Sequence, residues 1–315
     1  MDLSLLERFG FIEVSSRIIL NKFPKIKKIA KKLRGSASHG DAKASEARAD
    51  IDPAWKKDYF DKLSANLSDG DIVLIHSSMD GLESIGISAE DFMDFMHAQA
   101  DERGITFVLP CFPITNLKKP TPKSRPYDPK KTLCWTGMLP NAFIGDADVI
   151  RSRFPYNSLA AMGRQAGAMM AHDLDADTVY DLNSPWRYCL DNHCKIIFAG
   201  VKASGSNTMA IHMTCDVMAA DWPVTDWYED VTYKIRIGGE VSEKTIKVQK
   251  DFWYQYCMEE RTSGRLKEAG VLTEESIHGC NFGLVTDSGQ MMDVLIGLCN
   301  QGKLMYKIPR KYLKR

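Results

Sequence analysis

The fold is indicated most clearly by the stretch Cys194-Lys-Ile-Ile-Phe-Ala-Gly-Val-Lys-Ala-Ser-Gly-Ser-Asn-Thr-Met-Ala-Ile-His-Met-Thr-Cys-Asp216. Its apolar block, residues 196–199, is short and rich in branched and aromatic side chains, and Gly200 ends it, which predicts a buried strand. A Gly/Ser loop follows, and residues 206–208 offer N-cap oxygens for a helix. We expect His212 in the first turns of that helix, beyond the end of a strand, where α/β folds collect ligands.

A second strand and turn precede this stretch. Ile72-Val-Leu-Ile75 is a predicted strand, and His76-Ser-Ser-Met-Asp-Gly-Leu-Glu-Ser-Ile-Gly86 is a small polar loop before a predicted helix over 89–100. Backbone N–H groups at such a turn suit a phosphate or pyrophosphate. The turn has neither a Walker lysine motif nor G-x-G-x-x-G, so nucleotide hydrolysis and nicotinamide binding are disfavoured. A further predicted strand over 105–109 ends at Pro110.

Size and composition limit the class of protein. The chain has 315 residues, of which 44% are apolar and 26% charged, enough for one large globular domain or two ordinary ones. It lacks the long apolar run of a membrane span and the features of a signal peptide, so we expect a cytoplasmic protein. The eight cysteines form no Cys-x-x-Cys pair, which indicates buried free thiols and neither a disulfide framework nor a metal site. A formal net charge of zero disfavours nucleic acid as a partner.

The N-terminal part differs from the rest in charge. Residues 1–34 carry nine Lys/Arg against three Asp/Glu, which predicts a basic amphipathic helical extension. Its apolar stripe consists of Phe23, Ile26, Ile29 and Leu33. Such a helix suits peripheral docking on the inner face of an anionic membrane or on an acidic protein, with a solvated helix over the main domain as the alternative. Residues 35–52 are a predicted flexible linker, so we place the folded domain at 53–315.

The rest of the domain mixes helices with a hairpin. Residues 231–237 and 241–248 alternate with a two-residue period around a Gly-Gly turn, which predicts an antiparallel hairpin. We expect an alanine-rich helix through 160–166, a helix start at Ser184-Pro185, and a solvated acidic loop at 173–181. The predicted fold is therefore α/β: a three-layer sandwich with a mixed central sheet and helices on both faces, plus a small antiparallel β hairpin region.

Seven short pieces of this sequence recur together, in the same order, in a known family. They are His76-Ser-Ser with Gly86, Val108-Leu-Pro110, Gly137, Arg151-Ser152 with Pro155 and Ser158, Ala161 with Gly163, Ser184-Pro185, and Gly200-Val201 with Thr208 and His212. Together they resemble the aminoglycoside 3-N-acetyltransferase family over residues 55–305, although no single piece is specific. The resemblance implies an N-acyltransferase that uses acetyl-coenzyme A, or another acyl-coenzyme A, to modify an amine of an amino sugar or related metabolite.

The resemblance also implies a site. His212 is similar to the family's catalytic histidine, which takes the proton of the substrate amine as the amine attacks the thioester carbonyl, and an imidazole pKa near 6.5 suits that task. The coenzyme-binding residues implied by the resemblance and by the polar turn are His76, Ser77, Ser78, Met79, Gly86, Pro110, Cys111, Arg151, Ser152 and Ser158.

Two positions depart from the family pattern. Cys215 stands where the family has a glutamate three residues after the histidine, so Asp216, which shares a helix face with His212, is expected to orient the imidazole instead. Phe154 replaces a histidine in the family's Arg-Ser-x-His-Pro pattern. Two alternatives stay open: a covalent route through Cys111 or Cys215, and a catalytically weakened scaffold of the same fold that binds coenzyme A or a glycan.

Overall fold

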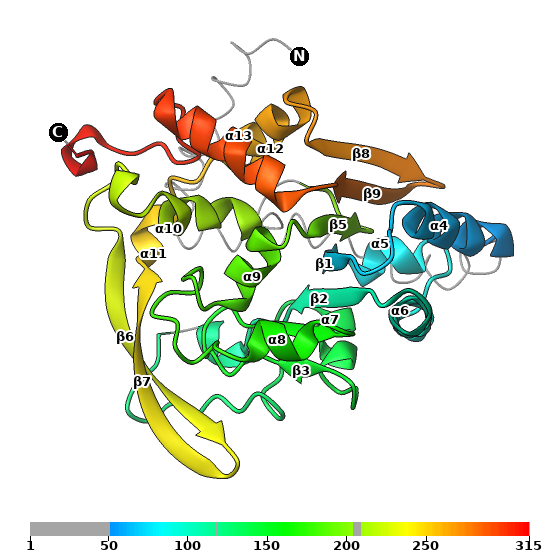
Figure 1. The fold of residues 1–315 in the computed structure, drawn as a ribbon, viewed down its shortest axis with the longest axis horizontal. Helices are drawn as coiled ribbons and strands as arrows, with labels where there is room; N and C mark the ends of the chain where they lie inside the picture. The colour runs from blue at the N-terminus through cyan, green and yellow to red at the C-terminus, as the bar shows by residue number, and fades with distance from the viewer. Residues whose placement is uncertain (1–50, 118, 204–208, 315) are drawn as a thin grey trace, which may run out of the picture.

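A seven-stranded sheet is the centre of the computed structural model, which describes residues 51–117, 119–203 and 209–314 (Figure 1). Its strands are β1 (Ile72–Ser77), β2 (Thr106–Pro110), β3 (Ile150–Arg151), β4 (Leu159–Met162), β5 (Lys195–Ala199), β8 (Leu272–Ile277) and β9 (Cys280–Val285). They lie in the order β3-β4-β2-β1-β5-β9-β8. β1 is parallel to both β2 and β5, and the other neighbouring pairs are antiparallel. The predicted mixed sheet is confirmed.

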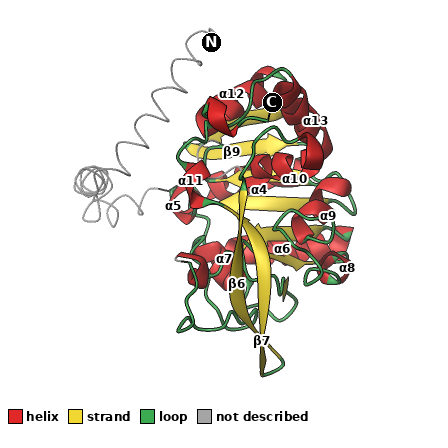
Figure 2. Ribbon diagram, turned by 90° about the vertical axis from the view of Figure 1, so that its left-hand side faces the viewer, coloured by secondary structure: helices red, strands yellow, loops and turns green. Residues whose placement is uncertain are grey.

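Helices cover both faces of this sheet (Figure 2). On one face lie α4 (Pro53–Ala65), α5 (Met79–Glu83), α6 (Ala89–Arg103) and α7 (Met138–Phe143). On the other lie α8 (Ala166–Met170), α9 (Pro185–Asp191), α10 (Thr214–Met218), α12 (Glu259–Glu268) and α13 (Ser288–Asn300). Because side chains alternate along a strand, Ile72 and Leu74 of β1 enter one core and Val73 and Ile75 the other. The three-layer arrangement is thus the one expected.

A separate two-stranded hairpin runs along one side of the sandwich (Figure 1). It consists of β6 (Tyr228–Ile237) and β7 (Glu240–Gln249), joined by Gly238 and Gly239, both at positive φ. Glycine adopts this backbone without a steric penalty, which explains the tight turn. The remaining short elements are α11 (Asp251–Tyr254) and the 3₁₀ helices η2 (Ile114–Leu117), η4 (Met209–Met213), η5 (Ala219–Asp221) and η6 (Arg310–Tyr312).

The expected alanine-rich helix at residues 160–166 is wrong. Ala160 and Ala161 lie in β4, paired with Leu109 and Val108 of β2, and both are fully buried. Alanine has the highest intrinsic helix propensity, but that preference amounts to less than about 1 kcal/mol per residue, and pairing with a buried neighbouring strand outweighs it. The helix α8 begins only at Ala166.

The acidic run at 173–181 is also not wholly solvated. Asp173 is fully buried, where it accepts hydrogen bonds from Ser152 Oγ at 2.9 Å and from Arg153 Nε at 2.8 Å. A buried carboxylate needs such partners because burial without them is costly. Asp173 therefore fastens the segment after β3 to the loop that follows α8.

Several predictions concern residues outside the described part of the chain. These are the basic extension at 1–34, most of the linker at 35–52, and the N-cap residues 206–208. All eight cysteines are free and buried, as expected. Within the described residues, no helix combines the length and apolar character that crossing a membrane requires.

Candidate active site

A cavity of about 430 Å³ opens where the parallel strands β1 and β2 end. This edge of an α/β sheet commonly binds ligands. The cavity is lined by residues from distant parts of the chain: Ile75, His76, Ser77, Pro110, Phe112, Trp135, Thr136, Pro140, Tyr156, Asn157, His212, Asp251, Tyr254 and Glu259. It therefore connects the end of β1 with His212.

His212 is held in a defined orientation. It lies on the 3₁₀ helix η4, which continues into α10, and its ring is almost completely buried. Its Nδ1 shares a hydrogen bond with the Tyr306 hydroxyl, and Gln249 Nε2 donates to the same hydroxyl at 3.2 Å. Burial raises the pKa of Tyr306 well above its usual value, so this hydroxyl is neutral. In the tautomer whose Nδ1–H donates to the Tyr306 oxygen, Nε2 is the nitrogen that can accept a proton in a reaction.

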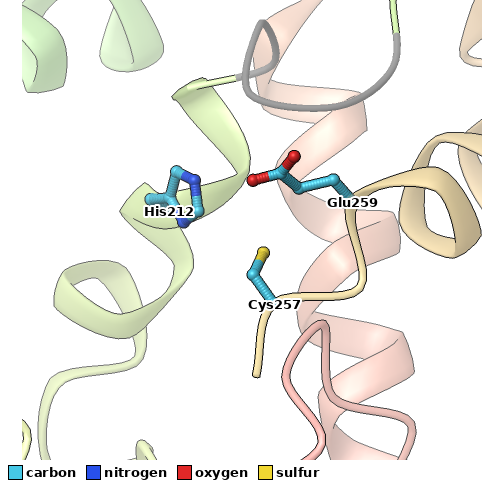
Figure 3. A group of neighbouring side chains, drawn as sticks. All are labelled: His212, Cys257 and Glu259. Atoms are coloured by element: carbon cyan, nitrogen blue, oxygen red, sulfur yellow. The ribbon is translucent and has the colours of Figure 1, made fainter. Parts of the chain in front are cut away.

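Glu259 and Cys257 converge on His212 (Figure 3). One ring nitrogen of His212, the Cys257 Sγ and a Glu259 carboxylate oxygen all lie within 4.8 Å of one another, and all three residues are buried. Glu259 begins α12 and also lines the cavity, whereas Cys257 lies in the turn just before that helix. A carboxylate at this distance stabilises the protonated form of an imidazole.

His76, the last but one residue of β1, is a second histidine on the cavity. Its ring stacks on Phe198 with centroids 5.2 Å apart, and burial lowers its pKa to about 3, so it is neutral at physiological pH. Its buried Nε2 has no hydrogen-bond partner among the described residues. Because buried polar atoms are rarely left unpaired, this nitrogen is well placed to bond a ligand in the cavity.

The cavity wall is acidic and aromatic. Asp251 and Glu259 contribute carboxylates, and no lysine or arginine is among its described lining residues. Phe112, Trp135, Tyr156 and Tyr254 contribute rings. Carboxylates attract a positively charged amine, and aromatic faces suit the apolar face of a ring-shaped ligand.

Comparison with known proteins identifies the family. A model of the aminoglycoside 3-N-acetyltransferase family matches residues 74–294, well over half of the sequence. The chain belongs to the aminoglycoside 3-N-acetyltransferase family. It is accordingly an N-acetyltransferase, and acetyl-coenzyme A is its acetyl donor. No curated protein matches the sequence.

Three solved structures illustrate the shared fold. Apo aminoglycoside acetyltransferase AAC(3)-IVa is 19% identical with a TM-score of 0.63, covering 81% of this chain and 92% of that one. AAC-IIIb in its binary complex with CoASH is 14% identical with a TM-score of 0.65, covering 81% and 98%. YokD from Bacillus subtilis is 16% identical with a TM-score of 0.58, covering 76% and 96%. At these identities the likeness concerns the fold.

Two predicted catalytic residues of this acetyltransferase have other partners. The Asp216 carboxylate accepts hydrogen bonds from Tyr228 Oη at 2.8 Å and Thr178 Oγ1 at 3.0 Å, which joins α10 to the hairpin. Cys215 is buried, its Sγ donates to the His212 carbonyl at 3.0 Å, and burial raises the pKa of its thiol. Neither residue lines the cavity. The acid beside the imidazole in Figure 3 is Glu259, which takes the place that Asp216 was expected to fill.

The turn after β1 is held by close backbone packing. The Ser78 N–H donates to the Ala199 carbonyl at 2.9 Å, and a Cβ built on Gly81 would lie only 2.1 Å from the Gly200 carbonyl oxygen. Met79 is buried. Of the four turn residues predicted to bind coenzyme, His76 and Ser77 line the cavity, and Ser78 and Met79 do not.

Other predicted coenzyme residues support the loops around the cavity. The buried Arg151 guanidinium donates to the Cys111 carbonyl at 2.6 Å and to that of Thr132. Ser158 Oγ donates to the same Cys111 carbonyl at 2.9 Å, and Ser152 Oγ bonds Asp173. The Arg151 and Ser158 side chains thus hold the segment after β2 in shape, although the buried Arg151 Nε has no hydrogen-bond partner among the described residues. Contact of Arg151, Ser152 and Ser158 with coenzyme stays a prediction.

The last three predicted coenzyme-binding residues, Pro110, Cys111 and Gly86, lie in different surroundings. Pro110 lines the cavity, and its contact with coenzyme stays a prediction. Cys111 is fully buried beside it, where burial raises the pKa of its thiol and disfavours a nucleophilic role. Gly86 lies at a separate surface hollow, together with Ile51 and Pro53. Phe154 packs in the core.

Acetyl-coenzyme A fits the chemistry of this cavity. A thioester carbonyl accepts hydrogen bonds, and the unpaired Nε2 of His76 and the hydroxyl of Ser77 lie at the wall to offer them. Four residues at the candidate site were not predicted from the sequence: Glu259, Asp251, Tyr254 and Tyr306. They lie far from His212 in the chain, and no local spacing links them to it.

Proposed function

We propose that this acetyltransferase modifies an amine of an amino sugar or related metabolite by direct transfer, with His212 as the general base and Glu259 as its carboxylate partner. The observation that supports this most strongly is the shared cavity. His212 and Glu259 line it together with His76 and Ser77 at the end of β1. An amine and a thioester can therefore meet between them.

The carboxylates that line the cavity first attract the acceptor amine. An aliphatic amine is mostly protonated at neutral pH, so Asp251 and Glu259 favour its entry as an ammonium ion. Only the neutral amine has a lone pair for attack, and a neighbouring imidazole can remove the proton. Nε2 of His212 receives it, while Nδ1–H donates to the Tyr306 oxygen. The Glu259 carboxylate stabilises the imidazolium that results.

His76, at the end of β1, is placed to bind the acetyl donor. Acetyl-coenzyme A supplies an activated acetyl group as a thioester. His76, neutral at physiological pH, donates its Nε2–H toward the carbonyl oxygen on which negative charge grows. One such donor can contribute about 3 kcal/mol. The C–N bond forms, the C–S bond breaks, and the proton held by His212 is available for the departing thiolate.

Two observations support an amino sugar as the acceptor: the aromatic residues that line the cavity and the ligands bound in structurally similar proteins. Structural neighbours of 16–18% identity were solved with sisomicin or apramycin. In this chain Tyr156, Tyr254 and Trp135 offer faces against which a sugar ring can pack. A single amino group suffices for the chemistry, so mono-amino sugars are included as acceptors.

The experiment measures release of free coenzyme A thiol from acetyl-coenzyme A with a panel of amino sugars, using the matching neutral sugars as negative controls. We expect turnover with amines alone, and His212→Ala to lower kcat by at least about 100-fold. His172→Ala, at a histidine 72% exposed on the surface, is the matched control. Unchanged turnover in His212→Ala would exclude the base role. Coenzyme A binding without turnover on any amine would support the scaffold alternative instead.

We further propose a cytoplasmic enzyme that docks through residues 1–34, on the basis of their excess of cations. Deleting this segment is expected to abolish sedimentation with anionic vesicles. If the truncated and full-length proteins sediment alike, the segment is not the docking element.

A further inference from the structure

The cluster of His212, Cys257 and Glu259 has the composition of a metal site. An imidazole nitrogen, a thiol and a carboxylate are the three ligand types that Zn²⁺ uses in proteins. Their ligand atoms lie within 4.8 Å of one another, and each residue is at most 5% exposed. The catalytic proposal uses His212 and Glu259 but has no role for the buried thiol of Cys257.

The geometry needs only a small adjustment to hold an ion. Zinc binds nitrogen and oxygen at about 2.0–2.2 Å and sulfur at about 2.3 Å, so tetrahedral ligand atoms are roughly 3.5 Å apart. The present separations of at most 4.8 Å exceed this value by no more than about 1.3 Å. Three side chains converge from two segments, η4 and the turn that leads into α12 (Figure 3).

The surroundings of the cluster also resemble those of metal sites. Histidines that bind metals usually bond a second group through the other ring nitrogen, which fixes the ring. Nδ1 of His212 has this contact in Tyr306, and Gln249 in turn donates to the Tyr306 hydroxyl at 3.2 Å. An isolated β-bridge joins the backbones of Cys257 and Tyr306. The same pairing therefore positions the Cys257 thiol and the Tyr306 hydroxyl that bonds His212.

The cluster is reached from the cavity. His212 and Glu259 line the cavity wall, whereas Cys257 lies behind them and is fully buried. An ion bound by all three would keep its fourth position toward the cavity, as in zinc sites with three protein ligands. It would also occupy the His212 nitrogen that the proposed reaction needs.

We propose that His212, Cys257 and Glu259 form a binding site for Zn²⁺ that reversibly inhibits acetyl transfer. Binding replaces the thiol proton of Cys257 with the ion and withdraws His212 from its role as base. The binding site stands on the cluster itself, and only the inhibition rests on the proposed function of His212. The site thereby couples the enzyme to the local supply of free zinc.

Binding is tested without substrates. The full-length protein, stripped with a chelator, is titrated with Zn²⁺ by calorimetry, and with Co²⁺ to detect the thiolate-to-metal absorption. We expect one ion per chain with release of about one proton, and Cys257→Ser to weaken affinity by about 100-fold and abolish that absorption. Cys299→Ser, at a buried cysteine on α13, is the matched control and keeps both properties. No saturable binding, or equal binding in Cys257→Ser, would overturn the site.

Inhibition is tested on the same proteins with each rate normalised to that of the same protein in chelator. Zinc is expected to lower wild-type turnover, a chelator to restore it, and the inhibition constant to rise about 100-fold in Cys257→Ser. If zinc binds but leaves turnover unchanged or raises it, the inhibitory role is refuted. Absence of acetyl transfer in chelator would count against the proposed function alone, because the binding titration does not depend on it.

Discussion

His76 should make the stability of this protein sensitive to mild acid. Its imidazole has a pKa of about 3 in the folded protein, against 6.5 for a solvated histidine, because burial disfavours its charged form. The unfolded chain therefore takes up a proton below pH 6.5 that the folded chain refuses. The contribution of His76 to stability is therefore complete above pH 6.5 and is lost as the pH falls from 6.5 toward 3.

The size of the effect follows from the two pKa values. Each pH unit below 6.5 lowers the free energy of unfolding by about 1.4 kcal/mol, so at pH 5 the loss from this one group is about 2 kcal/mol. The variant His76→Gln has no titrating ring at this position. It also loses the stacking on Phe198, but that loss is the same at both pH values and cancels in the comparison.

The assay is urea unfolding of both proteins at pH 7 and pH 5. We expect the wild type to lose about 2 kcal/mol more than His76→Gln between these conditions. His172→Gln, at an exposed histidine, serves as the control and should follow the wild type. If wild type and His76→Gln lose equal stability, the His76 ring is solvated or paired in solution, and its role as a neutral donor to the thioester fails with it.

Three further outcomes are expected. Asp251→Asn should raise KM for an amino-sugar acceptor about fivefold in steady-state assays and leave KM for acetyl-coenzyme A unchanged, since one exposed charge contact contributes about 1 kcal/mol; equal effects on both would exclude a role in acceptor binding. Tyr306→Phe should lower kcat about tenfold and leave both KM values unchanged, because one hydrogen bond to His212 is lost; an unchanged kcat would show that Tyr306 does not position the ring. Gly81→Ala should lower the free energy of unfolding by about 3 kcal/mol in urea, because its Cβ would meet the Gly200 carbonyl; wild-type stability would show that the turn relaxes easily.

Much of the fold follows from local patterns. The two-residue alternation around Gly238 predicts the hairpin, and short apolar runs predict β1 and β5, because burial on both faces of a sheet demands such runs. β4 escaped prediction because Ala160 and Ala161 carry a helical preference that only strand pairing overrides. No sequence pattern within residues 159–162 indicates that this segment pairs with β2.

Only the part of the candidate site that local patterns determine was predictable. His76 lies at the carboxyl end of β1 and His212 on the helical segment that follows β5, so their positions follow from the topology of an α/β sheet. Glu259 and Tyr306 reach His212 through the packing of α12 and the segment after α13, which no local spacing encodes. Asp216 was the nearest acid in sequence, yet Tyr228 and Thr178 bond its carboxylate.

The contact between Gly81 and Gly200 bears on how the enzyme can be redesigned. That junction leaves no room for even one added carbon, so the turn that follows β1 tolerates little variation. The part of the cavity proposed to face the acceptor, the acceptor wall, is formed by other segments: Trp135 in the loop before α7, and Asp251 and Tyr254 after the hairpin. Mutant libraries aimed at new acceptors should therefore randomise the acceptor wall and spare the glycine junction.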